Sequence, residues 1–319
     1  MMPRLLDRLA EGPLIADGAM GTQLFLAGLE QGHCGDAWNL AHPDRVLAIQ
    51  REYVDAGSDC LLTNTFGASR LMLARHGHAA DAAAINAAGV RIAREALGGR
   101  PGFVIGDIGP FGGFLEPIGD AREADVRAAF EEQARALAGA GADAIIIETQ
   151  TALDELGLAL RAAREAGVPC VIGSMAYDAT RDGANFRTMM GVDPERAVAF
   201  MQDAGADIVA LNCGTGMDMA RAREAVERYR RVTDLPIMVQ PNAGQPVLAG
   251  MRVVYLETPE HMAEGVVPLV EAGARIVGGC CGSTPDHIRA FRRALDGWSR
   301  GANGVRPPQA RRNAAARPA

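Results

Sequence analysis

The chain has 319 residues, of which 48% are hydrophobic and 22% charged, so it holds enough apolar material to fold around a full core without disulfides or a structural metal. Its 32 basic and 39 acidic side chains give a net charge of −7, which argues against a nucleic-acid-binding surface. Every basic side chain is arginine, and the lack of lysine in the sequence excludes Schiff-base catalysis and a P-loop nucleotide site.

The N-terminal segment and the cysteine content predict a reducing compartment. Residues 1–18 carry Arg4, Asp7, Arg8 and Glu11 where a signal peptide needs an uninterrupted apolar stretch. No uncharged apolar run reaches the roughly 18 residues that span a bilayer, so we expect a cytoplasmic protein that does not bind a membrane. The cysteines are then expected to be thiols or metal ligands rather than disulfides. They are Cys34, Cys60, Cys170, Cys213, Cys280 and Cys281.

Eight short apolar runs follow one another along the chain. Val, Ile and Leu are nearly continuous in them rather than alternating with polar residues, which indicates parallel strands that are buried on both faces. The runs cover residues 14–20, 60–66, 103–109, 144–150, 171–177, 207–213, 236–242 and 274–281.

Amphipathic segments with helical spacing separate these runs, for example residues 43–57 and 121–141, and several end at a glycine that is typical of a helix C-cap. This alternation predicts an α/β fold, a single-domain (β/α)8 TIM barrel over residues 1–298. A doubly wound sheet is the alternative. The arginine- and proline-rich residues 299–319 are predicted to form a disordered tail.

The active site of such a barrel lies at the C-terminal ends of its strands. Cys213 ends one predicted strand, and the adjacent pair Cys280–Cys281 ends another, so three thiols are expected to converge there. Cys60 and Cys170 stand at the starts of strands, toward the opposite end, and Cys34 is in a loop.

Neighbouring residues of a strand point to opposite faces, so Cys280 and Cys281 can bind one ion only where the strand has ended. We expect Gly278, Gly279 and Gly282 to supply the backbone freedom for that change. Three thiolates select zinc, and a vacant fourth position is typical of catalytic zinc. The alternative is that these cysteines only pack a tight corner.

Six motifs, taken together, resemble the homocysteine S-methyltransferase family, which includes the homocysteine module of cobalamin-dependent methionine synthase and the betaine–homocysteine methyltransferases. They lie at residues 16–22, 61–69, 148–155, 211–214, 242–246 and 278–288. The resemblance runs from Ile15 to Phe291. It implies a (β/α)8 barrel in which Cys213, Cys280 and Cys281 hold zinc. It also implies that zinc-bound homocysteine thiolate attacks a methyl donor and yields methionine.

The resemblance further assigns the amino-acid end of homocysteine. Glu148 is implied to bind the substrate ammonium, and the turn Asp17-Gly18-Ala19 is implied to bind the head group through backbone N–H groups. Asn64 and Asn242 are candidate polar residues of the same pocket. The alternatives are helix capping by Glu148 and Asp17 and turn formation by the two asparagines.

The methyl donor is the least determined part of this prediction. The sequence has no D-x-H-x-x-G element, so the donor is either a free small molecule or methylcobalamin on a separate corrinoid protein. A betaine-like onium compound is our first expectation, followed by the corrinoid protein and then S-methylmethionine. Aromatic faces would hold an onium group, but Gly67 and Thr149 stand where the betaine enzymes have tyrosines. The candidate replacements are Phe66, Phe111, Phe114, Tyr177 and Phe186.

A zinc or thiol sensor that has kept the barrel is the non-enzymatic alternative. The oligomeric state cannot be predicted from these patterns.

Overall fold

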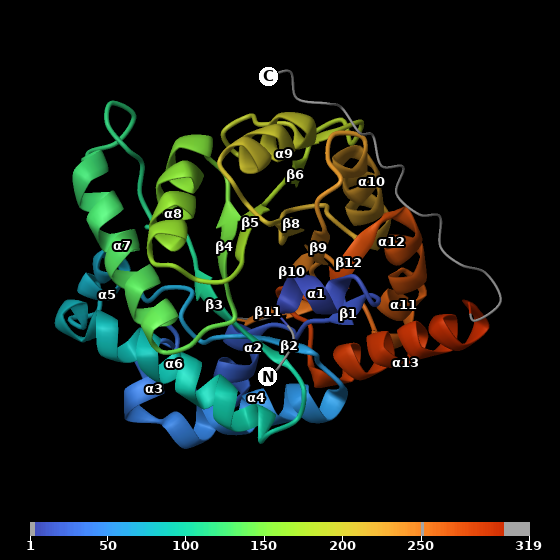
Figure 1. Cartoon of the computed structure of the whole chain (residues 1–319), viewed down its shortest axis with the longest axis horizontal. Helices are drawn as coiled ribbons and strands as arrows, with labels where there is room; N and C mark the ends of the chain where they lie inside the picture. The colour runs from blue at the N-terminus through green and yellow to red at the C-terminus, as the bar shows by residue number, and fades with distance from the viewer. Residues whose placement is uncertain (1–3, 250–251, 303–319) are drawn as a thin grey trace, which may run out of the picture.

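The computed structural model describes residues 4–249 and 252–302. Its centre is one eight-stranded parallel sheet, in which the neighbouring strands follow the order β1-β12-β9-β8-β5-β4-β3-β2 (Figure 1). These strands are β1 (Leu14–Ile15), β2 (Cys60–Leu62), β3 (Phe103–Ile108), β4 (Ala144–Gln150), β5 (Val171–Met175), β8 (Ile208–Asn212), β9 (Ile237–Gln240) and β12 (Ala274–Val277). Each of the eight predicted strands is present.

The sheet closes on itself between its first two strands in the chain. Ala16, just after β1, forms a parallel bridge with Cys60 of β2, and the N–H of Asp17 donates to the Cys60 carbonyl at 3.0 Å. The predicted barrel is therefore confirmed, and the doubly wound alternative is wrong because the edge strands of an open sheet would not pair.

Helices surround the strands, as Figure 1 shows. They are α1 (Leu5–Leu9), α2 (Met20–Leu26), α3 (Trp38–Ala41), α4 (Pro43–Ala56), α5 (Arg70–Ala74), η1 (a 3-10 helix, Ala79–Asp81), α6 (Ala82–Leu97), α7 (Glu123–Gly139), α8 (Leu153–Glu165), α9 (Pro194–Asp203), α10 (Met219–Arg230), α11 (Pro259–Glu264), α12 (Val266–Ala272) and α13 (Pro285–Ala302). Helix α4 ends at Gly57, whose φ of 104° is the predicted left-handed cap.

Helix α13 continues to Ala302, past the boundary predicted at residue 298. Residues 303–319 of the predicted tail lie outside the described residues. Among residues 4–249 and 252–302, no helix is long and apolar enough to cross a membrane.

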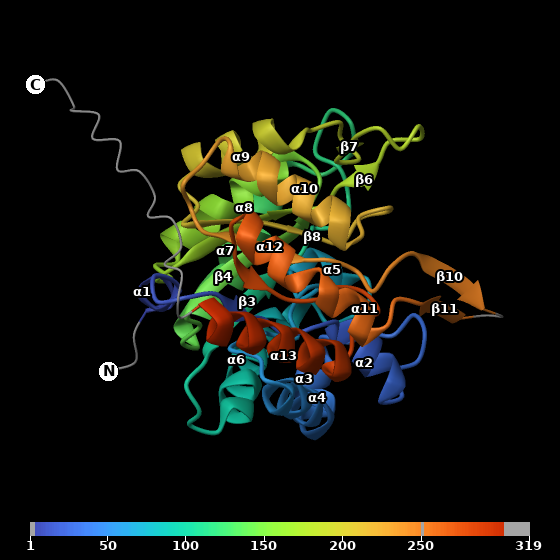
Figure 2. The same cartoon turned by 90° about the vertical axis from the view of Figure 1, so that its right-hand side faces the viewer.

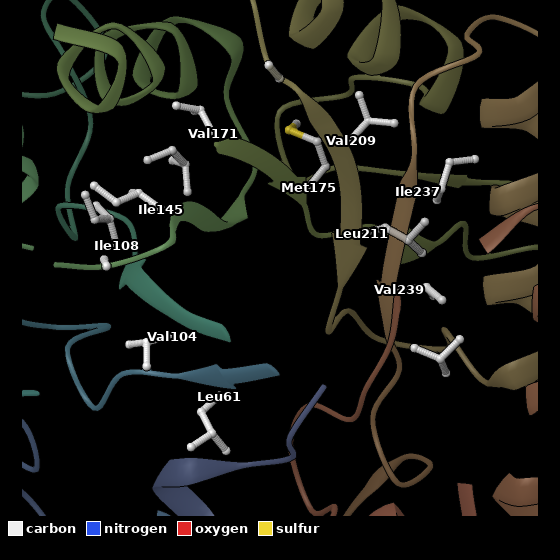
Figure 3. Close-up of a cluster of buried hydrophobic side chains, with 14 of the residues drawn as sticks. Leu61, Val104, Ile108, Ile145, Val171, Met175, Val209, Leu211, Ile237 and Val239 are labelled. Atoms are coloured by element: carbon white, nitrogen blue, oxygen red, sulfur yellow. The ribbon is translucent and has the colours of Figure 1, made fainter. Parts of the chain in front are cut away.

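Alternate residues of each strand face two different environments. One set fills the inside of the barrel, and the other packs against the surrounding helices, which explains why the apolar runs are continuous. The inner set includes Leu14, Ala16, Cys60, Leu62, Phe103, Ile105, Ala144, Ile146, Cys170, Ile172, Ile208, Ala210, Met238 and Ile276. The outer set, part of which is labelled in Figure 3, includes Leu61, Val104, Ile145, Val171, Val209 and Ile237.

Helix α1 closes the N-terminal end of the barrel. Leu5 and Leu9 are 2% and 4% exposed and belong to the inner cluster that also holds Cys60 and Cys170. Figure 2 shows α1 at one end of the molecule and two antiparallel hairpins at the other. The hairpins are β6–β7 (Asp178–Ala179 and Phe186–Arg187) and β10–β11 (Pro246–Ala249 and Arg252–Tyr255). Neither α1 nor the hairpins were predicted. Because α1 closes the N-terminal end of the barrel, a site can open only at the C-terminal end, beside the hairpins.

Replacing Leu9 with alanine is expected to lower the free energy of unfolding by about 2–5 kcal/mol, because it leaves a cavity in the barrel interior. Urea denaturation measures this loss. Leu6→Ala is the matched control: Leu6 is only half-buried at the edge of the same cluster, so its loss should be smaller. Equal losses for the two variants would show that α1 does not seal the barrel through Leu9.

Candidate active site

The inside of the barrel changes from apolar to polar at the C-terminal ends of the strands. Two residues beyond the inward-facing Ile105 and Ile146 stand Asp107 and Glu148. The same step along three other strands reaches Ser174, Asn212 and Gln240, and all five polar side chains are at most 8% exposed. A buried polar layer at this end of a barrel marks the place of a ligand site.

Three cysteines meet above this layer. Cys213 follows β8, and Cys280 and Cys281 follow β12. The Cys213 and Cys281 sulfurs are 3.9 Å apart, those of Cys280 and Cys281 are 4.0 Å apart, and all three lie within 4.8 Å of one another. Tetrahedral zinc with Zn–S bonds of about 2.3 Å would space its sulfur ligands about 3.8 Å apart. The three thiols could therefore hold one metal ion with only small adjustments.

The end of β9 holds both cysteine segments. The N–H of Cys213 donates to the Gln240 carbonyl at 3.2 Å, and the N–H of Cys280 donates to the Pro241 carbonyl at 2.8 Å. Cys213 has a φ of +56°, which is left-handed and rare for a residue with a side chain. The next residue, Gly214, has a φ of +93°, and a Cβ there would collide with the Tyr177 carbonyl oxygen. This turn therefore needs glycine.

The glycines around Cys280 and Cys281 act differently from our prediction. Only Gly282 has a positive φ, +80°. A Cβ on Gly278 would lie 2.9 Å from the Asp17 carbonyl oxygen, and a Cβ on Gly279 would collide with the Ser283 side chain. Gly278 and Gly279 are thus required by close packing, whereas Gly282 alone supplies the unusual backbone conformation.

Hydrogen bonding among the three cysteines shifts their pKa values in opposite directions. Hydrogen bonds from Cys280 and Cys281 lower the pKa of Cys213 well below its usual range. Hydrogen bonding with Cys213 raises the pKa of Cys281 to about 11, and it raises the pKa of Cys280 as well. A bound dication would displace the remaining protons, because metals bind thiolates rather than thiols.

The thiols are accompanied by three buried carboxyl groups. Burial raises the pKa of Glu148 to about 8 and raises those of Asp17 and Asp107 well above the ordinary value. One oxygen of Asp17 accepts the Leu62 N–H at 2.8 Å, but its other oxygen and Oδ1 of Asp107 have no partner among the described residues. The same residues provide no ion pair to any of the three carboxyls. These unpaired acceptors suit a cationic ligand with several N–H donors.

Asp107 was not among our predicted site residues. Its position at a strand end, with the same inward direction as Ile105 two residues earlier, could have identified it.

The turn Asp17-Gly18-Ala19 packs against the cysteine loop. The Ala19 N–H donates to Oγ of Ser283 at 3.1 Å, and the N–H of Gly279 donates to the Asp17 carbonyl at 3.0 Å. The turn thus lies beside the loop that carries Cys280 and Cys281, and its Ala19 N–H is already engaged by Ser283.

The two asparagines differ. Nδ2 of Asn64 donates to the Gly35 carbonyl at 2.9 Å and to Oδ1 of Asn39 at 3.1 Å, so this amide braces a loop. Nδ2 of Asn242 donates to the Gly214 carbonyl at 3.2 Å, and its Oδ1 has no partner within the described part of the chain. Asn242 therefore lies beside the turn that carries Cys213, whereas the Asn64 amide points toward the loop that contains Gly35.

The aromatic residues expected to hold an onium donor do not form a cage. Phe111, Tyr177 and Phe186 are at most 4% exposed, and the Tyr177 hydroxyl is hydrogen-bonded to the Tyr229 hydroxyl at 2.7 Å. This part of the expectation is wrong, because these rings belong to the hydrophobic core. Only Phe66 and Phe114 are accessible, at 40% and 44%.

One aromatic residue near the cysteines was missed. The ring of Tyr255 packs over Gly282, because the β10–β11 hairpin returns the chain to the barrel mouth. No sequence signal placed that hairpin.

The comparisons with known proteins agree with this site. Residues 14–295 match the family model described as homocysteine S-methyltransferase. The chain is 34% identical over 305 residues to methionine synthase from Mycobacterium tuberculosis and 33% identical to that from Mycobacterium leprae. Each match covers 91% of this chain but only 25% of the relative. The chain thus spans about a quarter of the length of these curated relatives.

Among solved structures, the metallated form of the homocysteine methyltransferase MmuM from Escherichia coli aligns with a TM-score of 0.74 and 23% identity. This alignment covers 91% of this chain and 98% of that one. It supports the barrel fold. Since the family model covers most of the sequence, the chain belongs to the homocysteine S-methyltransferase family.

Proposed function

We propose that this protein is a zinc-dependent homocysteine S-methyltransferase that forms methionine. The observation that carries the proposal is the pairing of two features at one end of the barrel. Three sulfurs lie within 4.8 Å of one another, and the same end of the barrel holds buried carboxyl groups that form no ion pair with any residue in 4–249 or 252–302. Homocysteine has the complementary ends, a thiol and an ammonium group.

Cys213, Cys280 and Cys281 would hold zinc and leave a fourth position for the substrate sulfur. Zinc bound there would lower the pKa of the substrate thiol, which is about 8.5 when free, so that the sulfur is a thiolate at neutral pH. Glu148, with Asp107 and Asp17 nearby, would pair with the ammonium and orient the sulfur toward the barrel mouth. The sulfur–carbon bond then forms as the bond from the methyl group to its donor breaks, and the donor keeps the electron pair.

We further propose that a corrinoid-carrying protein domain, rather than a small onium compound, delivers the methyl group. Three of the five candidate cage aromatics are in the core, whereas large apolar side chains are exposed on segments that follow strand ends. These are Phe25, Leu26, Phe66, Phe114, Ile118, Met189, Met190, Val247, Leu248 and Leu256. Such a rim suits contact with a protein. The methionine synthases that this chain resembles have about three quarters of their length outside the match.

A donor screen tests the function. Zinc-loaded protein is mixed with L-homocysteine and with betaine, S-methylmethionine or methylcobalamin, and methionine is followed by mass spectrometry. We expect methionine from methylcobalamin, with cob(I)alamin as the second product, and little from betaine. Efficient turnover with betaine would support an onium compound as the methyl donor and would contradict the proposed corrinoid donor. Zinc binding without turnover on any donor would favour the sensor.

The purified protein is expected to bind about one zinc per chain, and Cys280→Ser should lose it while remaining folded. Zinc-edge absorption should show three sulfur ligands and one oxygen or nitrogen ligand before homocysteine is added, and four sulfurs afterwards. We expect the displaceable ligand to be water or an oxygen or nitrogen atom of a residue at a strand end.

Cys213→Ser and Cys281→Ser should behave like Cys280→Ser. The matched controls are Cys60→Ser and Cys170→Ser, which change buried thiols at the other end of the barrel and should retain the metal. A folded and fully active Cys280→Ser variant, or four sulfurs without substrate, would overturn the proposed centre.

Glu148→Gln should retain zinc but bind homocysteine tens- to thousands-fold more weakly, because loss of one partner of a buried charged pair costs about 2–5 kcal/mol. The free carboxyl is mostly neutral below its pKa of about 8, and it must ionise to pair with the ammonium. Wild-type affinity should therefore rise with pH toward 8, and this dependence should be shallower in the variant.

Calorimetry in two buffers of different ionisation enthalpy measures the affinity and the protons released. Glu155→Gln is the control, since Glu155 is also buried with a raised pKa but accepts the Phe111 N–H outside the barrel interior. Unchanged homocysteine affinity in Glu148→Gln would remove Glu148 from the site.

A further inference from the structure

The side chain of Asn212 connects three strand ends of the site. Asn212 is the last residue of β8 and is 1% exposed. Its Nδ2 donates to Oγ1 of Thr149 at 2.7 Å, and its Oδ1 accepts the N–H of Thr149 at 3.0 Å. The same Oδ1 accepts the Ser174 hydroxyl at 2.7 Å. Nδ2 also lies 3.7 Å from the sulfur of Cys280.

Thr149 is held in a strained conformation. Its φ is +57°, which is unfavourable for a β-branched residue and persists only where neighbouring groups enforce it. The pairing of β4 with β5 is irregular at this point: Ile147 pairs with Gly173, and Gln150 pairs with Met175. Two residues of β4, Glu148 and Thr149, therefore lie opposite a single residue of β5, Ser174. Such a bulge changes the direction of the side chains that it contains. The two hydrogen bonds between Asn212 and Thr149 fix this bulge and hence the direction of Glu148.

The same amide acts at the metal-binding end of the site. The N–H···S contact with Cys280 would stabilise a thiolate ligand and orient it, as hydrogen bonds to metal ligands generally do. Asn212 also immediately precedes Cys213, whose φ is left-handed. One buried side chain therefore contacts the bulge that carries the carboxyl group and the loop that carries a sulfur.

We propose that Asn212 is a positioning residue that sets the separation between Glu148 and the metal-binding sulfurs, and thereby selects an amino-acid thiol of the length of homocysteine over the shorter cysteine. The inference rests on the proposed function. A fixed separation rejects a substrate that is one methylene too short, because its ammonium and sulfur cannot reach both partners at once. Loosening the bulge removes that penalty.

The test uses the zinc-loaded full chain and its Asn212→Ala variant. Zinc affinity is measured by competition with a chelator, and homocysteine and cysteine binding by calorimetry. We expect zinc affinity to fall about 10–100-fold. Homocysteine binding should weaken by at least about tenfold while cysteine binding changes less, so the preference between them narrows.

Thr149→Gly in the Asn212→Ala background separates the two contacts. Glycine adopts a positive φ without strain, so the bulge should re-form and the homocysteine preference should largely return. Zinc affinity should stay low, because the contact with Cys280 is still missing.

Asn212→Ser, which retains a small polar group, replaces Asn212→Ala if that variant does not fold. Thr233→Ala is the control: Thr233 is buried and its hydroxyl donates to Oε1 of Gln202, before the start of β9. It should lower the melting temperature without changing zinc affinity or the thiol preference.

Folded Asn212 variants with wild-type zinc affinity and wild-type preference would overturn the inference. Failure of the wild-type protein to bind zinc or homocysteine would instead contradict the proposed function.

Discussion

Closure of the parallel barrel is the constraint on which every other feature depends. The bridge between Ala16 and Cys60 completes a ring of eight parallel strands, so all eight C-terminal ends meet at one face. Cys213 and Cys280 are far apart in the chain, yet their strands, β8 and β12, lie on either side of β9. The carbonyls of Gln240 and Pro241 at the end of β9 accept the backbone N–H groups of Cys213 and Cys280. The backbone of the fold therefore brings the three sulfurs together.

Burial gives the site its chemical character. Glu148, Asp17 and Asp107 stand above an apolar interior, where a carboxylate without a partner is costly. Burial raises the pKa of each of them. A cationic group that entered this layer would be stabilised far more than in water, because few solvent molecules compete with it. A dication among the thiolates, or an ammonium group among the carboxylates, would supply the stabilisation that water gives to such groups when they are exposed.

Backbone strain is concentrated at the candidate active site. The two residues with side chains and positive φ in the described part of the chain are Thr149 and Cys213, next to Glu148 and Asn212 respectively. Neighbouring groups hold both unusual conformations. The side-chain amide of Asn212 forms two hydrogen bonds with Thr149. Gly214, the residue after Cys213, packs tightly against the Tyr177 carbonyl. Strain at such positions is maintained where it aims a functional side chain.

The sequence by itself determined the eight strands, their parallel arrangement and the three cysteines at strand ends, because continuous apolar runs and glycine-capped helices report local structure directly. It also singled out Glu148 at a strand end. Only the tertiary structure decided which polar groups share the candidate site: Asp107 joins it, the Asn64 amide turns toward a loop, and Tyr177 and Phe186 lie in the core. The hairpin that carries Tyr255 and the bonds of Asn212 were equally beyond prediction. Side-chain direction and contacts across the barrel depend on bulges, loop paths and closure, and these arise between segments that are distant in the chain.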